Sequence, residues 1–592
     1  MADATLRKRN ATKASQSAAS SNDAEDVEVA SATSVTTGRL AYLVFSIIVA
    51  GFLYMYPDVI LQLSEQWLGS SYVESPLPGA GDPHAIDLSA DIGKRDAVVE
   101  AFKHAWLAYE RDAMGDDEYH PISHKGSNLT KAGGIGYTVA DSIDTMLIMG
   151  LDDEYQRAKE WVATKLSFDR DANFNTFETT IRVLGGLLSA YHLSDDPVFL
   201  EKAVDLGDRI LTTFDTPSGL PLTMVNLGRR VGVADPDYPG LVSTAEVATL
   251  QLEFRYLTLL TDDDIYWKKA EKVMAIIKAA RMPPGLATIF MNYQEGRFVP
   301  AAIRLGSRGD SYYEYLLKQY LQTNRTEHVY REMYADTMDA IHGHLIKTSM
   351  NSHLTYTAEL IPERNMNGEL SWRLTPKQDH LVCFLGGSLM LGAVTTEALV
   401  DEVPIPPKSE LLTSHGIRDW KTGAELIRTC MATHETATGL APEIVHFRIP
   451  SDGVDSMLQG QAPQDWYIKG ARPRQFPPLD ARYILRPETV ESLFLAFRVT
   501  GDRRYREWGW QIFQAIEKHC RIETGGYASV VNVDELPVRH EDKMETFLMS
   551  ETLKYLYLLF ADASVLPLSD YVFNTEAHPF PVFNPPIRTG FS

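Results

Sequence analysis

Cysteine and positive charge are both scarce in this sequence. Only three Cys occur among 592 residues and none forms a CxxC pair, so we expect neither a disulfide-stapled scaffold nor a structural zinc site. The count still allows one disulfide with one thiol left over. Lys and Arg total 56 against 79 Asp and Glu, a net charge of −23. Because nucleic-acid binding depends on neutralising phosphates, this balance argues against a nucleic-acid partner.

Long apolar runs are also rare. The sequence is 44% hydrophobic and 23% charged, which suits a large folded core and excludes a wholly disordered, collagen-like or multi-span membrane protein. Residues 40–56 (LAYLVFSIIVAGFLYMY) are the exception, with no charge over 17 residues. That length is the lower limit for spanning a bilayer. We predict a transmembrane signal anchor, the alternatives being a buried core helix or a secretory signal.

Charge on the two sides of residues 40–56 predicts the topology. Arg39 lies directly before this segment, and the next Lys or Arg is Lys94, so the positive-inside rule places the N-terminus in the cytosol. Residues 1–39 contain no aromatic residue and are expected to form a disordered cytosolic tail. The rest would be lumenal, as the sequons at Asn128 and Asn324 fit.

Beyond the predicted anchor, turn-rich and apolar-periodic segments divide the chain. Residues 57–95 contain the turn-rich sequence ESPLPGAGDP and are predicted to form a lumenal stem between the anchor and the globular domain. A globular domain is predicted over 96–583, followed by a tail over 584–592. Apolar residues recur at helical spacing, as in Val98, Phe102, Ala105 and Tyr109, in about fourteen segments. Paired helices predict a closed double ring, with a repeat solenoid as the alternative. Short β-like runs are expected at 527–533 and 571–583.

Acidic and aromatic residues concentrate in six short clusters: NTFETTIR (175–182), RLGSRGDSYYEYLLKQY (304–320), KQDHLVCFLGG (377–387), RPETVES (486–492), METFLMSETLKY (544–555) and FNTEAHP (573–579). Together with GYTVADSIDTMLIMGL (136–151) and FDTPSGLP (214–221), and in this order, they resemble the class I α-1,2-mannosidases of glycoside hydrolase family 47 over roughly residues 96–583. The resemblance implies an all-α (α/α)7 barrel closed by a short C-terminal β-hairpin, Ca2+ as cofactor, inversion at the anomeric carbon, and high-mannose N-glycans of the secretory pathway as substrate.

Three acids are the catalytic candidates implied by the resemblance: Glu178 on the proton-donor side, Asp310 as a second catalytic carboxylate, and Glu488 as the base. An inverting glycosidase needs one carboxyl to protonate the leaving oxygen and another, roughly 6.5–9.5 Å away, to activate water. Pro487 predicts a helix start that places Glu488 at the positive end of the dipole, which favours its ionised form. Asn175 looks like a helix cap before Glu178, so burial or a neighbouring acid would have to keep a proton there.

For calcium, no DxDxDG pattern is present, and the resemblance implies Thr575 as the direct ligand. Waters held by Glu488, Glu491, Glu551 and Glu576 would complete the shell. It also implies Arg182, Glu246, Arg308, His380, Arg486, Phe547, Glu551 and Glu576 as substrate contacts, and a Cys383–Cys430 disulfide. Cys520 would remain a free or buried thiol.

Two features bear on the subclass. Arg308 in GSRGD resembles the endoplasmic-reticulum type, which removes mainly one mannose from the nine-mannose glycan. Asn226-Leu227-Gly228 is closer to Golgi-type relatives that trim to five. We therefore expect a membrane-anchored endoplasmic-reticulum enzyme. The alternatives are a Golgi-type mannosidase and a mannosidase-like lectin that directs misfolded glycoproteins to degradation.

Overall fold

The computed structural model describes residue 77 and residues 86–280, 285–449, 465–472 and 475–591. The predicted cytosolic tail (1–39), the predicted anchor (40–56) and most of the predicted stem lie outside these residues. Within them, no helix combines the length and apolarity needed to cross a membrane. The chain divides into units 1–75 and 76–592, and all described residues belong to the second.

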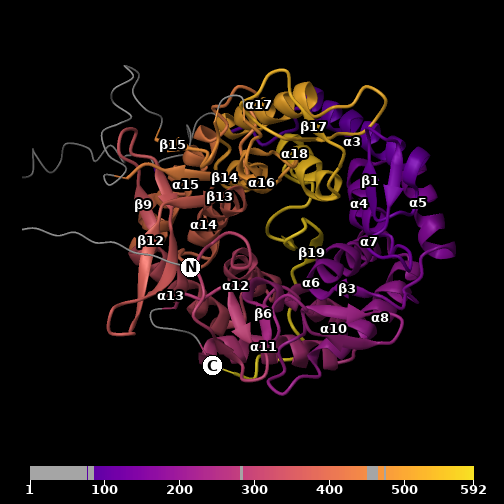
Figure 1. The fold of residues 1–592 in the computed structure, drawn as a ribbon, viewed down its shortest axis with the longest axis horizontal. Helices are drawn as coiled ribbons and strands as arrows, with labels where there is room; N and C mark the ends of the chain where they lie inside the picture. Colours follow the sequence, from indigo (N-terminus) through magenta and orange to yellow (C-terminus); the bar gives the residue numbers. More distant parts are fainter. Residues whose placement is uncertain (1–76, 78–85, 281–284, 450–464, 473–474, 592) are drawn as a thin grey trace, which may run out of the picture. The chain divides into compact units, whose positions relative to one another are not determined.

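Helices arranged as two concentric rings dominate the described unit (Figure 1). Outer and inner helices alternate along the chain, and contacts of α18 with α3, and of the adjoining turn with α4, close the ring. Fourteen helices of eight or more residues occur in the described part, seven in each ring, as an (α/α)7 barrel requires. The outer helices are α3 (Ile92–Ala113), α5 (Asp152–Thr164), α8 (Pro197–Leu211), α11 (Ile265–Ala280), α13 (His328–His344), α15 (Ser414–Ala432) and α17 (Arg503–His519). The inner helices are α4 (Tyr137–Met149), α7 (Gly185–Ser194), α10 (Gln251–Thr261), α12 (Asp310–Gln322), α14 (Phe384–Thr395), α16 (Glu488–Thr500) and α18 (Leu553–Phe560).

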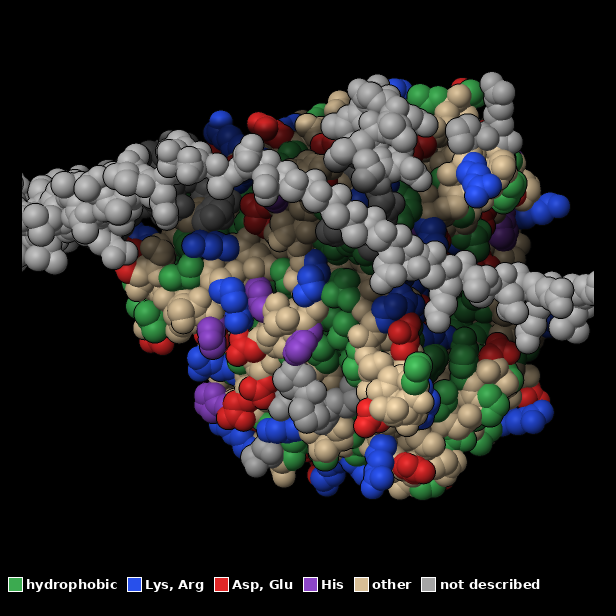
Figure 2. All heavy atoms as spheres, turned by 60° about the vertical axis from the view of Figure 1, so that its left-hand side comes forward, with side chains coloured by type: hydrophobic (Ala, Val, Ile, Leu, Met, Phe, Trp, Pro, Cys, Tyr) green, Lys and Arg blue, Asp and Glu red, His purple; other side chains and the backbone are tan. Residues whose placement is uncertain are grey.

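Burial distinguishes the two rings. Every residue of inner helix α16 is buried, whereas outer helix α17 buries one face, the pattern of a helix between core and solvent. The predicted turns separate them: α16 ends at Thr500 with Gly501 in the left-handed conformation (φ +69°), and the Asp502 side chain then caps α17. On the face shown in Figure 2, acidic and basic side chains are interspersed.

Strands are more numerous than predicted. The two predicted runs contain β16 (Ser529–Val530), and β18 (Tyr571–Phe573) with β19 (Pro579–Pro581). The other strands of the described residues were not predicted. Together with these three they form five two-stranded and three three-stranded sheets, in which neighbouring strands are antiparallel. They are β1 (Glu118–His120), β2 (Lys125–Ser127), β3 (Asn173–Asn175), β4 (Met224–Asn226), β5 (Val231–Val233), β6 (Leu241–Ser243), β7 (Phe290–Asn292), β8 (Arg297–Phe298), β9 (Ile346–Thr348), β10 (Thr355–Thr357), β11 (Glu359–Arg364), β12 (Leu370–Thr375), β13 (Lys377–Asp379), β14 (Ile444–Phe447), β15 (Trp466–Tyr467) and β17 (His540–Glu541).

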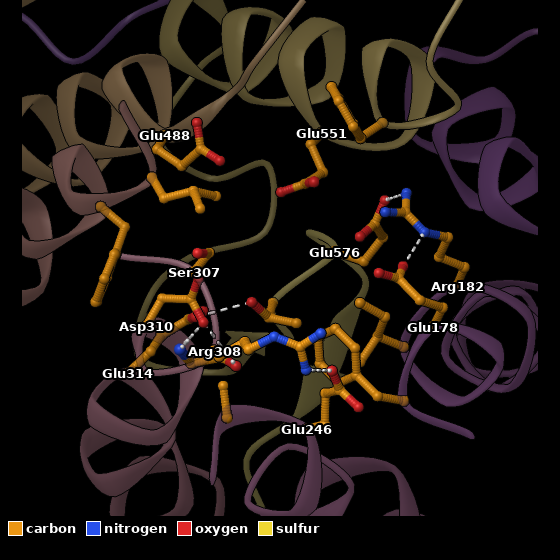
Figure 3. Close-up of a pocket in the computed structure, with 18 of the residues that line it drawn as sticks. Glu178, Arg182, Glu246, Ser307, Arg308, Asp310, Glu314, Glu488, Glu551 and Glu576 are labelled. Atoms are coloured by element: carbon orange, nitrogen blue, oxygen red, sulfur yellow. Dashed lines mark hydrogen bonds and ion pairs between the residues drawn. The ribbon is translucent and has the colours of Figure 1, made fainter. Parts of the chain in front are cut away.

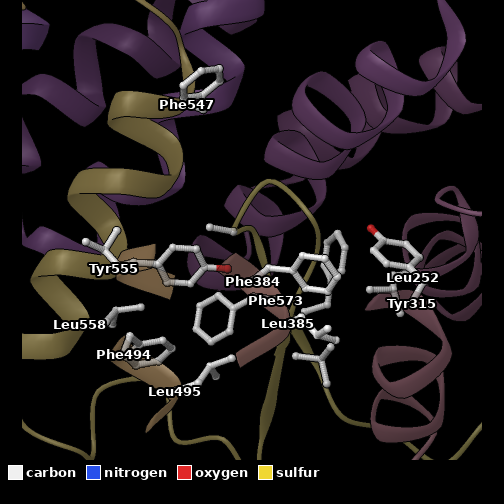
Figure 4. Packing of buried hydrophobic residues seen from close by; sticks show 14 of the residues in the cluster. Leu252, Tyr315, Phe384, Leu385, Phe494, Leu495, Phe547, Tyr555, Leu558 and Phe573 are labelled. Carbon is white, nitrogen blue, oxygen red and sulfur yellow. The ribbon is translucent and has the colours of Figure 1, made fainter. Parts of the chain in front are cut away.

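The β18–β19 hairpin occupies the centre of the ring, as the resemblance implied (Figure 1). Phe573 packs against Phe494 of α16 and Tyr555 of α18, with ring centroids 5.6 Å and 5.8 Å away, inside the apolar cluster of Figure 4. The hairpin also contacts α7 and α12. Burial of aromatic rings on several inner helices therefore fixes the turn that carries Thr575.

Both ends of the described unit differ from the predicted boundaries. Helix α3 begins at Ile92, inside the predicted stem, because the Asp91 side chain caps it. The predicted C-terminal tail, residues 584–592, contacts the outer ring: the Thr589 N–H donates to Glu327 (2.8 Å), and the ring of Phe591 lies 6.0 Å from that of Tyr330. Cys383 and Cys430 form a disulfide between the start of α14 and α15, and Cys520 is a buried free thiol.

Candidate active site

A cavity of about 330 Å³ lies among the inner helices and the hairpin turn (Figure 3). Its size is that of a small-ligand pocket. Three Arg and eight carboxylates line it, so acid is in excess. The Arg are Arg182, Arg308 and Arg486, and the acids are Glu178, Glu246, Asp310, Glu314, Glu488, Glu491, Glu551 and Glu576.

The three predicted catalytic acids lie near the N-terminal ends of inner helical segments. Asp310 and Glu488 are the first residues of α12 and α16. Glu178 ends the short helix α6 (Thr176–Glu178), and the Asn175 side chain accepts from its N–H at 2.8 Å, the predicted cap. Glu178 and Glu488 lie on opposite sides of the cavity (Figure 3). Helix starts therefore bring together acids that are 310 residues apart in sequence.

Burial changes the chemistry of two of these acids. It raises the pKa of Asp310 to about 7, with the charges of Glu314 and Glu488 adding to the shift. It also raises the pKa of Glu488 to about 7, although Arg486 opposes the shift. Burial of Glu488 therefore opposes the helix dipole, which favours the ionised form.

Arg182 connects Glu178 to the hairpin turn. Its Nε donates to Glu178 at 2.9 Å and its Nη1 donates to Thr546 at 3.0 Å and to Glu576. Tyr137 also donates to Glu178, at 3.2 Å. Arg182 belongs to a π-helical turn, Thr179–Leu184, and Glu551 lies in a second, Leu548–Thr552. Such turns recur at functional sites because they redirect side chains within a helix.

Arg486 lies beside Glu488, as Arg182 lies beside Glu178. It forms a forked pair with Glu443, with Nε–Oε1 and Nη2–Oε2 both 3.0 Å, and its Nη1 is 3.5 Å from Glu488. The ring of Phe547 lies between the two arginines, 5.6 Å from the guanidinium carbon of Arg182 and 5.7 Å from that of Arg486. Both guanidiniums are thus held in place by carboxylates and by one aromatic ring.

Thr575, the predicted metal ligand, lies in the turn between β18 and β19 and lines the cavity. Its hydroxyl donates to Glu314 at 2.8 Å. Burial raises the pKa of Glu491 to about 8 and those of Glu551 and Glu576 well above their usual range. Among the described residues, no three acidic, His or Cys side chains converge closely enough to hold a metal ion.

Two predicted substrate contacts have unexpected surroundings. Glu246 lines the cavity and pairs with Arg308 (Oε1–Nη1 3.2 Å), and burial raises its pKa to about 7. His380 is buried but does not line the cavity: its Nε2 is 3.1 Å from the Thr489 hydroxyl and 3.9 Å from Glu488 Oε2. The 3-10 turn His380–Cys383 places this ring behind Glu488, where burial lowers its pKa.

Glu314 was not predicted as a site residue, although its spacing in the sequence indicates one. It lies four residues after Asp310 in the cluster 304–320, and this spacing places both on one face of α12. Lys318, four residues further on, donates to Glu314 and lies 3.5 Å from Glu491. Ser307, also in the cavity wall, carried no signal of its own.

Comparison with known proteins identifies the family of the chain. The family model described as glycosyl hydrolase family 47 matches residues 101–582. The chain belongs to this family. This chain is 43% identical over 507 residues to the mannosyl-oligosaccharide 1,2-alpha-mannosidase of Candida albicans, and the match covers 83% of this chain and 85% of the relative. It is also 43% identical over 507 residues to the endoplasmic reticulum mannosyl-oligosaccharide 1,2-alpha-mannosidase of Schizosaccharomyces pombe, covering 84% and 91%.

A solved structure of the same kind supports the fold. The alpha-1,2-mannosidase from Trichoderma reesei superimposes with a TM-score of 0.71 at 27% identity, covering 83% of this chain and all of that one. The predicted family and the (α/α)7 barrel are confirmed. Membership of this family and the mannosidase relatives show that the chain is a glycoside hydrolase. They therefore favour the predicted enzyme over the lectin alternative.

Proposed function

We propose that this glycoside hydrolase removes terminal α-1,2-linked mannose from high-mannose N-glycans, with inversion at the anomeric carbon and with Ca2+ as cofactor. The observation that carries the proposal is the placement of Glu178 and Glu488 on opposite sides of one acid-rich cavity, with Asp310 beside them (Figure 3). Inversion requires this arrangement because water attacks one face of the sugar while the leaving oxygen is protonated on the other.

Glu488 is assigned as the base. A water attacks the anomeric carbon and gives a proton to Glu488, while the bond from that carbon to the leaving oxygen breaks and the oxygen takes a proton from the opposite side. Glu178 is assigned to that side, acting through a water. Burial raises the pKa of both Asp310 and Glu488 to about 7. Arg486, 3.5 Å from Glu488, favours the ionised form of that acid, so Asp310 is the carboxyl better suited to hold a proton at neutral pH.

The residues around Thr575 fit calcium. Hard cations prefer oxygen ligands, and this part of the cavity offers the Thr575 hydroxyl and the acids Glu488, Glu491, Glu551 and Glu576. Among the described residues, Glu488 Oε2 is buried without a hydrogen-bond partner, a cost that a cation with its waters would relieve. Thr575 would hold the ion directly and the acids through water. A bound Ca2+ would supply coordination sites for sugar hydroxyls and would favour the ionised carboxylates.

The relatives and Arg308 support the proposed location and product. Endoplasmic-reticulum enzymes are among the relatives, and Arg308 lines the cavity. We assign the chain to the endoplasmic-reticulum membrane as a single-pass type II protein, anchored by residues 40–56, with the barrel lumenal. There it would trim nine-mannose glycans to eight during glycoprotein maturation and quality control.

Proton NMR of a fresh digest of a high-mannose glycan by the full chain, purified in detergent with calcium, tests this proposal. The first mannose released should be the β-anomer, with the α-anomer growing later by mutarotation. Appearance of α-mannose first would refute inversion, and absence of any released mannose would refute the activity.

A further inference from the structure

The segment 234–240, between β5 and β6, has a defined shape beside the cavity. Its sequence is ADPDYPG, in which Asp, Pro and Gly are typical of a turn. The Asp237 N–H donates to the Asp235 side chain at 2.8 Å, and the Leu241 N–H donates to the Tyr238 carbonyl at 3.0 Å. Such bonds hold the turn and with it the position of the Tyr238 ring.

Tyr238, Phe290 and Arg308 contact one another as a group of three. The Tyr238 and Phe290 ring centroids are 5.0 Å apart, and the guanidinium carbon of Arg308 lies 5.1 Å from the first ring and 5.2 Å from the second. Phe290 is in β7, paired in register with Ser243 of β6, which lines the cavity. The same guanidinium forms the 3.2 Å pair with Glu246. Arg308 is therefore held by two rings and one carboxylate.

The backbone at Arg308 is also constrained. Its φ of +68° lies in the left-handed region, which non-glycine residues adopt mainly where their surroundings enforce it. The Arg308 carbonyl accepts from the Ala245 N–H at 3.0 Å, in the segment that carries Glu246. Side chain and backbone are thus both fixed against the β6–α9 segment, where α9 spans Thr244–Val247.

Exposure distinguishes the two aromatic rings. Tyr238 is 41% exposed, whereas Phe290 is half-buried within its sheet. Tyr238 does not itself line the cavity. An exposed ring that contacts one half-buried ring and one cavity arginine contributes little to the core, so its main effect should be on the orientation of that arginine.

We propose that Tyr238 is a positioning residue that sets the product specificity of the enzyme by fixing the Arg308 guanidinium at the cavity. This inference rests on the proposed function. With Tyr238 present, Arg308 hydrogen-bonds the branch that orients the nine-mannose glycan, and trimming stops largely at eight mannoses. Without the ring, the guanidinium has more freedom, so this orientation weakens and further mannoses become accessible.

The experiment compares the unaltered full chain and the variants Y238A, Y238F and Y238W, each in detergent with calcium. The nine-mannose glycan is the substrate, mass spectrometry identifies the products, and initial rates give kcat and KM. For Y238A we expect KM to rise about two- to fivefold, in line with loss of a cation–π contact, with kcat within about twofold. At equal consumption of the substrate, the fraction of products below eight mannoses should at least double. Y238F and Y238W, which keep a ring, should restore the wild-type pattern.

F476A is the matched control. Phe476 is also an exposed aromatic, 80% exposed, beside an arginine, Arg539, at 5.7 Å, but neither residue lines the cavity. F476A should leave KM and products unchanged. In an R308L background, Y238A should add no further change, because the residue acts through Arg308.

Each outcome decides between defined alternatives. A wild-type product pattern in Y238A, or an equal effect of Y238A in the R308L background, would overturn the positioning role; the second result would indicate direct contact of Tyr238 with the glycan. A fall in kcat alone, with the products unchanged, would also overturn it. If the unaltered chain trims rapidly to five mannoses, the proposed eight-mannose specificity fails first and this inference fails with it.

Discussion

The Thr575 hydroxyl donates a 2.8 Å hydrogen bond to Glu314, which lies one helical turn after Asp310. The Thr575 N–H also donates to the Tyr315 hydroxyl, and Lys318 donates to the Asn574 carbonyl, both at 3.3 Å, so several hydrogen bonds join the hairpin turn to α12, the helix that begins at Asp310. Because Thr575 is the proposed direct ligand, a change at the metal would act on the same helix that carries Asp310.

Calcium removal should therefore affect both activity and stability. We expect EDTA to abolish mannose release and to lower the melting temperature, because an ion bound only by the folded state stabilises it by about 2.7 kcal/mol at one hundred times its Kd. Calcium, added back, should restore both. Thr575→Val keeps the shape of the side chain without its hydroxyl and should show a smaller calcium-dependent shift in calorimetry. Full activity after exhaustive chelation, with calcium absent by elemental analysis, would refute the metal assignment.

Glu488→Gln should remove activation of water. We expect kcat to fall by about 10²–10⁴-fold or more, the usual contribution of a general base, with glycan affinity largely kept in isothermal titration. Glu507→Gln, on the solvent side of α17, is the control and should leave kcat unchanged. Near-wild-type kcat in Glu488→Gln would move the base role to Asp310, which Asp310→Asn would then test.

The sequence predicted the barrel well because its signals are long. Inner helices such as α16 are buried on all sides and outer helices such as α17 on one, and caps such as Asp502 mark the turns between them. Most strands were missed because they are two or three residues long. In β3 (Asn-Phe-Asn), for example, three residues are too few for an apolar alternation to be recognised.

Site residues, like the helices, were predicted where they lie in long or dense sequence patterns. Acids in dense motifs were identified through the family resemblance, and Glu314 could have been added from its spacing to Asp310. The pKa of Glu488 and the place of His380 behind it depend on enclosure by other helices, which no local pattern encodes. The contact between Tyr238 and Arg308 joins residues 70 positions apart and required the structure.

Arg308→Leu tests the proposed specificity directly. The wild-type chain should stop largely at an eight-mannose product, and the variant should remove further mannoses, because it loses the forked hydrogen bonds that a guanidinium makes to sugar hydroxyls. Mass spectrometry of a timed digest gives the result. Arg308→Lys, which keeps the charge without the fork, should be intermediate. Rapid trimming to five mannoses by the unaltered chain would indicate a Golgi-type enzyme instead.

Loss of the Cys383–Cys430 disulfide should destabilise the barrel without changing the site chemistry. The bridge closes a loop of 47 residues, for which a loss of about 2–4 kcal/mol in the free energy of unfolding is expected. Chemical denaturation of the C383A/C430A double variant measures it. Cys520→Ser alters only the free thiol and serves as the comparison for the pairing. Peptide mapping that finds Cys520 in the bridge would contradict the assignment.

The stability of the calcium-free chain should fall as pH rises from about 5 to 8. Burial raises the pKa of Glu246, Glu253 and Asp310 to about 7 each, from ordinary values of 4.5 for Glu and 3.8 for Asp. Between the unfolded and folded pKa values the native state binds more protons than the unfolded state, so unfolding becomes easier as pH increases through this window.

Glu253 allows that mechanism to be isolated. It is fully buried on α10, accepting from Tyr315 at 3.0 Å and from Asn574 at 2.8 Å, and it does not line the cavity. Glu253→Gln cannot ionise, so its melting temperature in EDTA should decline less between pH 5 and pH 8 than that of the wild type. Glu507→Gln should follow the wild-type curve. A melting temperature that rises across this range in the wild type would show that these buried acids do not govern the pH dependence, because depressed rather than raised pKa values produce that sign.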